Sequence, residues 1–149
     1  MIITTKQKIT QKTKGEWFTF EDKETEQECQ LLIKPANNPA FVQVWSKAAT
    51  YNEAQAERLG NKLDMTYDPD FRTPYDVQCE TLAYHLVEDW NGVVDADGNA
   101  VEFDPELLYT TMLFGNENKP NIKLFNFILA KSGEVAEKTA KEFNDTVKK

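Results

Sequence analysis

Four oxygen-bearing side chains in the middle of the chain have the spacing of a calcium-binding loop. The residues at relative positions 1, 3, 5 and 12 of that twelve-residue pattern are Asp95, Asp97, Asn99 and Glu106. Position 6 requires glycine for a sharp turn, but here it is Ala100, and the glycine stands two residues earlier at Gly98. At that place it suits a hairpin turn with a positive φ. We therefore expect no metal site and retain the four residues as weak metal candidates only.

Few side chains are available for a hydrolase triad. The chain has one histidine, His85, and one of its two cysteines, Cys79, lies on the same predicted helix. A separation of six residues places the two side chains roughly 240° apart around the helix axis, so they cannot meet. Neither Ser46 nor Ser132 lies in a strand–turn–helix elbow with flanking glycines. The six glycines also never cluster into a phosphate-binding loop. We expect no catalytic residues, no cofactor and a non-enzymatic role.

The net charge and the short apolar runs argue against two further classes of partner, nucleic acids and membranes. The 149 residues include 17 Lys and Arg against 25 Asp and Glu, which gives a formal net charge of −8. Duplex binding depends on cationic neutralisation of phosphates, so we expect no nucleic-acid partner. The longest apolar run has four residues, 127–130, whereas a membrane helix needs about 20. We expect no membrane partner and a soluble, cytoplasmic protein.

The local patterns predict one α+β domain over residues 1–149 that is mainly helical. Alternating apolar residues bounded by turn signals predict an N-terminal β-hairpin over 15–34, and a short second hairpin over 93–103 surrounds the Asp and Gly turn. Cap residues followed by proline start the helices at Asn38, Thr73 and Asp104. The predicted helices cover residues 39–60, 74–90, 105–114 and 119–145. We expect residues 1–14, which are rich in Lys, Thr and Gln, to form a flexible arm.

The last predicted helix carries a broad apolar face. Candidate partner-binding residues on this face are Phe125, Leu129, Ala136 and Phe143. The part of the helix from Glu134 onward is much more polar. A surface helix packed against the core of its own domain explains the same pattern equally well.

The middle of the chain also has a distinctive order of residues. A Trp closes a predicted helix, a Gly-Val pair opens a hairpin around an Asp and Gly turn, a Val-x-Phe strand returns, and a capped helix restarts. The residues in these places are Trp90, Gly92, Val93, Asp95, Gly98, Val101, Phe103 and Glu106. This region resembles the signature of the tail assembly chaperones of tailed bacteriophages and prophages. The resemblance covers roughly Thr73 to Ala130, and Asp104 stands where the family more often has Ser or Thr.

The resemblance implies a small protein of the bacterial host cytoplasm that binds the tape measure protein, and often the tail tube protein. Such a chaperone keeps these proteins soluble until the tail polymerises. The signature residues would then be structural anchors, and the oligomeric state stays open. One alternative is a calcium-binding or other small interaction module, a second is a structural component of the virion tail, and a small acidic enzyme ranks third.

Overall fold

An antiparallel three-stranded sheet and four helices form the described fold, which confirms the predicted α+β class. The computed structural model describes residues 14–23, 26–58, 60, 65–115 and 118–147. The elements in chain order are β1 (Glu16–Asp22), β2 (Gln27–Ile33), α1 (Pro39–Arg58), α2 (Pro74–His85), β3 (Val87–Asn91), α3 (Pro105–Phe114) and α4 (Ile122–Val147). Of the predicted flexible arm, residues 1–13 lie outside the described residues.

Strands β1 and β2 form the hairpin predicted for residues 15–34, with β2 in the centre of the sheet. Side chains of the two strands alternate between a face that packs on the helices and a face that meets solvent. Phe18 and Phe20 of β1 pack on the core side, directly opposite Leu31 and Cys29 of β2. Trp17, in contrast, is 48% exposed. The hairpin predicted from this alternation is thus present, and Phe18 and Phe20 mark its buried face.

The predicted helix over 74–90 is wrong at its end. Helix α2 stops at His85, Leu86 caps it, and Val87–Asn91 forms β3 against β2. The backbone N–H of Lys34 donates to the Leu86 carbonyl at 2.7 Å, just where helix changes to strand. Apolar residues at this junction fit a helical face as well as a strand. Pairing with the open edge of β2, distant in sequence, decides the outcome.

The second hairpin, predicted over 93–103, is reduced to a chain reversal. A single bridge joins Val94 to Ala100, and no strand is formed on either side of it. The Val101 N–H also donates to the Val93 carbonyl at 2.9 Å. A tight turn from Asp95 to Gly98 makes the reversal, with the Gly98 N–H donating to the Asp95 carbonyl at 3.0 Å and Gly98 taking a φ of +81°.

The three predicted helix starts are confirmed. The side chains of Asn38, Thr73 and Asp104 each accept a hydrogen bond from a backbone N–H two or three residues further on, at 2.9, 3.1 and 3.0 Å. A proline follows each cap as the first helical residue. These local signals are strong because the cap satisfies a backbone donor that the helix itself cannot.

The helix ends are close to their predicted positions. Helix α1 ends at Arg58 rather than at residue 60, and α3 occupies 105–114 as predicted. Helix α4 covers 122–147 in place of the predicted 119–145, with the Asn121 side chain accepting from the Leu124 N–H at 3.1 Å. Gly115 ends α3 with φ +57°, and a Cβ there would lie 1.9 Å from the Lys119 carbonyl oxygen. Only glycine fits this position.

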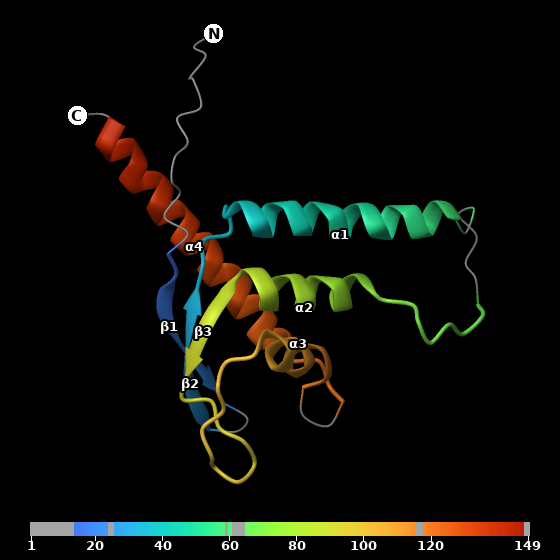
Figure 1. Ribbon diagram of the computed structural model, residues 1–149, viewed down its shortest axis with the longest axis horizontal. Helices are drawn as coiled ribbons and strands as arrows, with labels where there is room; N and C mark the ends of the chain where they lie inside the picture. Colours follow the sequence, from blue (N-terminus) through green and yellow to red (C-terminus); the bar gives the residue numbers. More distant parts are fainter. Residues whose placement is uncertain (1–13, 24–25, 59, 61–64, 116–117, 148–149) are drawn as a thin grey trace.

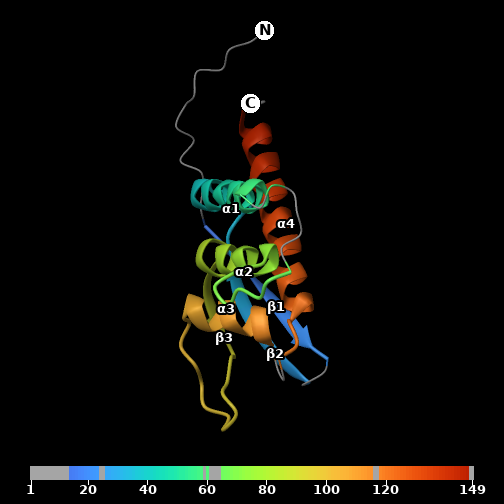
Figure 2. The same ribbon diagram turned by 90° about the vertical axis from the view of Figure 1, so that its right-hand side faces the viewer.

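The helices lie in a stack beside the sheet. Figure 2 shows α2 between α1 and α3, while α4 runs along the side of the stack and crosses the sheet. The Phe20 ring lies 5.1 Å from the ring of Phe127 on α4, and the Lys131 ammonium lies 5.5 Å from the Phe18 ring centre. Among the helices of the described residues, none combines the length and apolar content that a bilayer span requires.

One buried polar side chain joins three segments of this stack. Asn38 is 3% exposed, and its amide nitrogen donates to the carbonyls of Pro35 at 2.8 Å and His85 at 3.2 Å. Its side-chain oxygen accepts the Phe41 N–H at the start of α1. The amide nitrogen and the amide oxygen of the Asn38 side chain thus both bond to backbone groups at the junction between β2, α1 and the end of α2.

We expect Asn38→Asp to destabilise the protein as strongly as Asn38→Ala, by about 2 kcal/mol. A carboxylate keeps the cap acceptor but cannot donate to the two carbonyls, so the cap alone does not rescue stability. Urea denaturation followed by circular dichroism measures the difference. The exposed neighbour Asn37 supplies the matched control, since Asn37→Asp should stay within about 0.5 kcal/mol of the natural sequence. Stability equal to the natural sequence for Asn38→Asp would contradict this account.

Candidate functional site

A cavity of about 270 Å³ opens where the sheet meets the segment after β3 and the facing ends of α3 and α4. In Figure 1 this region lies at the opposite end of the molecule from the last turns of α4. The described residues that line it come from β1, β2, β3, α3, α4 and the connections between them. It is therefore a product of the tertiary fold and not of any single motif.

The floor of the cavity is apolar. It is formed by Phe20, Leu31, Leu108 and Leu124. Leu31 and Trp90 are direct partners in the β2–β3 register, which brings both side chains to the same face of the sheet. Leu31, Leu108 and Leu124 are no more than 6% exposed, so the floor continues into the hydrophobic core. Such a surface favours an apolar group over water.

The polar residues of the lining are uncharged or acidic. They are Asp22, Gln27, Glu28, Thr111 and Asn121. None of the described residues that line the cavity is Lys or Arg. Burial raises the pKa of the Cys29 thiol above its ordinary value, and the negative charges of Asp22 and Glu28 raise it further. The charged residues of the described lining are thus all acidic.

Residues of the sequence signature build one wall of the cavity. The Trp90 indole N–H donates to the Val101 carbonyl at 2.7 Å, and its ring meets Phe103 edge to face with centres 5.1 Å apart. Gly92 has φ +80° and lies next to the backbone of Glu28 and Cys29. The signature therefore holds the indole in a fixed place at the edge of the cavity.

The acidic turn inside the signature is closed by its own backbone. One Asp95 carboxylate oxygen accepts from the N–H groups of Asp97 at 2.9 Å and Asn99 at 3.0 Å. The Glu106 carboxylate accepts instead from the Tyr84 hydroxyl at 3.0 Å, on the face shared by α2 and α3. Within the described part of the chain, no three His, Cys, Asp or Glu side chains are grouped to hold a metal ion.

The side chains considered for a hydrolase triad are Cys79, His85, Ser46 and Ser132, and each of them lies on a helix. Burial raises the pKa of the Cys79 thiol to about 11, and burial followed by the charge of Lys34 lowers the pKa of His85. The Ser46 hydroxyl donates to the Val42 carbonyl at 2.8 Å, and the Ser132 hydroxyl donates to the Leu129 carbonyl at 2.7 Å. Each of the two hydroxyl groups is thus bonded to the preceding turn of its own helix.

The predicted partner-binding face of the last helix divides into two parts. Phe125 is 8% exposed and stacks on Tyr75 with ring centres 5.1 Å apart, so it belongs to the core. Leu129 and Ala136 are half-buried further along α4. The helix runs through Phe143, but the side chain of that residue lies outside the described part of the structure. Sequence periodicity alone did not separate core residues from accessible ones.

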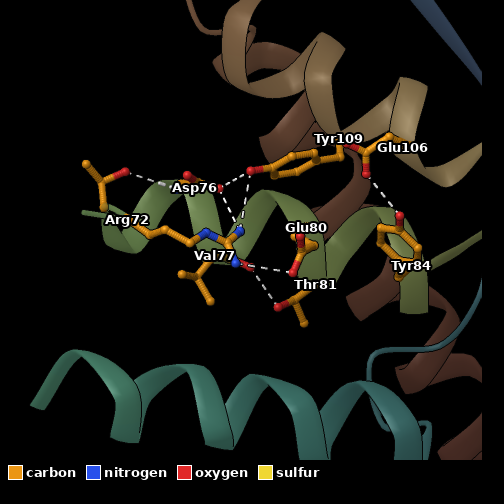
Figure 3. A network of polar contacts seen from close by, with 9 residues as sticks. Arg72, Asp76, Val77, Glu80, Thr81, Tyr84, Glu106 and Tyr109 are labelled. Atoms are coloured by element: carbon orange, nitrogen blue, oxygen red, sulfur yellow. Dashed lines mark hydrogen bonds and ion pairs between the residues drawn. The ribbon is translucent and has the colours of Figure 1, made fainter. Parts of the chain in front are cut away.

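A second polar arrangement, which the sequence reasoning missed, joins α2 to α3 (Figure 3). The Arg72 guanidinium contacts Asp76 at 2.7 Å and Glu80 at 3.4 Å, and the Tyr109 hydroxyl donates to Asp76. Although burial opposes the effect, the hydrogen bonds from Arg72 and Tyr109 lower the pKa of Asp76. Burial and the bond to Asp76 raise the pKa of Tyr109 to about 12. The i,i+4 spacing of Arg72 and Asp76 was the available signal.

We expect Asp76→Asn to cost about 1–2 kcal/mol of folding free energy near pH 7. Because the pKa of Asp76 is lowered in the folded state, the stabilisation is complete above its ordinary value of 3.8 and disappears as the pH falls through the lower folded value. The natural protein should therefore have a larger free energy of unfolding than the variant at neutral pH, and this difference should disappear in acid. Urea denaturation at several pH values measures this difference.

The matched control is Asp70→Asn, which removes a carboxylate from an exposed position. Its effect on stability should be within about 0.5 kcal/mol at every pH. A constant gap between the natural protein and Asp76→Asn down to about pH 2 would show that the charge of Asp76 contributes nothing.

Comparison with known proteins places the chain in a prophage family. The family model described as YdaY prophage protein matches residues 36–149, which is most of the chain and includes the signature and α1 to α4. The β1–β2 hairpin lies before the matched region. No curated protein and no solved structure matches the chain. The chain belongs to the YdaY prophage protein family.

Proposed function

We propose that this prophage protein is a non-enzymatic tail assembly chaperone, which binds the tape measure protein, the tail tube protein or both before the tail polymerises. The observation that carries the proposal is the open cavity with an apolar floor, walled by Trp90 and Gly92 of the chaperone-like signature. Membership of a prophage family agrees with a role in phage assembly. The proposed place of action is the cytoplasm of the bacterial host.

The mechanism would be masking of an aggregation-prone surface. An apolar side chain that a client exposes before assembly would enter the cavity and be withdrawn from water. The net charge of −8 would keep the complex soluble, because like-charged complexes repel one another. Polymerisation of the tail would bury the same client surface more extensively and so displace the chaperone.

The rigid wall supports this mechanism. Trp90 is held by its hydrogen bond to Val101 and by the Phe103 ring, so the cavity needs little reorganisation before binding. A pre-formed site avoids part of the entropic cost of ordering side chains on association. In this proposal the signature residues position the binding surface and do not themselves react.

Co-expression with the tape measure protein of the same prophage tests the proposal. We expect the natural protein to increase the soluble fraction of the client several-fold, and Thr111→Trp, which fills the cavity, to lose this effect. Thr50→Trp is the matched control, because Thr50 is also exposed and its hydroxyl also donates to the carbonyl four residues earlier. A client that is equally insoluble with and without the chain would refute chaperone activity.

Mass spectrometry of purified phage particles separates the chaperone from a tail component. A chaperone leaves when the tail is complete, so we expect no peptides of this chain in mature particles. Its presence there in stoichiometric amount would instead establish a structural component of the virion.

A further inference from the structure

We propose that the cavity receives one apolar side chain of a partner segment in which lysine or arginine residues flank that side chain. The inference rests on the proposed function, since it defines the chemistry of the partner that the same cavity binds. It follows from the size of the cavity, its apolar floor and the charges at its edge.

The size of the cavity favours a single side chain. Its volume of about 270 Å³ lies below the range of about 300–1,000 Å³ that is typical of small-molecule and cofactor sites. The floor offers Phe20, Leu31 and Leu108, while Gln27, Thr111 and Asn121 are the uncharged polar residues elsewhere in the lining. A large apolar side chain, such as Phe, Leu or Met, matches this space and surface.

The charges determine what should flank the apolar anchor. Asp22 lies on the same face of β1 as Phe20, because the two residues are separated by one strand position, and it is half-buried at the edge of the cavity. Glu28 also borders the cavity, but its strand position puts its side chain on the opposite face of β2 from Cys29 and Leu31. A cationic group next to the anchor would therefore be attracted, and an anionic group repelled.

The pKa of Cys29 supports this reading of the charges. After burial, the negative charges of Asp22 and Glu28 are the next contributions that raise the pKa of this thiol, which itself lines the cavity. The two carboxylates thus lie close enough to the Cys29 sulfur to disfavour a negative charge on it. The same carboxylates would stabilise a lysine or arginine side chain of a partner at the edge.

Peptide binding to the full-length chain tests the inference. The probe is a capped peptide of Ala and Gln residues with a central Phe between pairs of lysines, and calorimetry measures its dissociation constant. Replacing the central Phe by Ala keeps the charge and should weaken binding about tenfold, because the apolar contact is lost. Replacing the lysines by glutamates should abolish binding.

Two pairs of protein variants locate the peptide. Asp22→Asn should weaken binding of the Phe peptide about fivefold, whereas Asp97→Asn, which changes the net charge equally at an exposed turn outside the cavity, should leave it within about twofold. Thr111→Trp should abolish binding, and Thr50→Trp should have no effect. Circular dichroism verifies that every variant is folded before its affinity is compared.

The outcomes separate this inference from the proposed function. Equal affinity for the Phe and Ala peptides, equal effects of Asp22→Asn and Asp97→Asn, or no binding at about 1 mM peptide would each overturn the inference. In those cases chaperone activity in co-expression can still stand. Specific peptide binding without any solubilisation of the tape measure protein would instead support the inference and count against the proposed function.

Discussion

The antiparallel pairing of β3 with β2 is the constraint on which the rest of the structure depends. It ends α2 at His85 and places Trp90 opposite Leu31, so that the indole lines the cavity. The same pairing directs the chain from Gly92 into the acidic turn and back to Val101, whose carbonyl accepts the indole N–H. Without this register the cavity would lack both its floor and its wall.

Much of the fold could be predicted because its signals are local. The caps Asn38, Thr73 and Asp104 bind backbone groups within a few residues, and each precedes a proline, which a helix tolerates in its first turn but not in its interior. The identity of β3 could not be predicted, because Val87 and Trp90 are compatible with both a helical face and a strand. Only β2, more than fifty residues earlier, distinguishes the two.

Less of the candidate site than of the fold could be predicted from the sequence. Its lining joins residues from Phe20 to Leu124, and no spacing in the chain links the hairpin to the start of α4. The residues that resembled a calcium-binding loop have other roles. Asp95 accepts a backbone N–H that closes the turn, and Glu106 accepts a hydrogen bond from Tyr84. Three residues of the signature, Trp90, Gly92 and Val93, do line the cavity. The signature could not reveal the acidic residues of the hairpin that face them.

The β1–β2 hairpin lies outside residues 36–149, the region that the family model matches, yet it supplies the central strand and the carboxylates of the cavity. The helices and the acidic residues of the cavity lining are thus encoded in different stretches of the chain. Substitutions at Asp22, Gln27 or Glu28 alter the cavity without touching any helix start. The lining of the cavity can therefore change through a short N-terminal stretch while the helical frame stays the same.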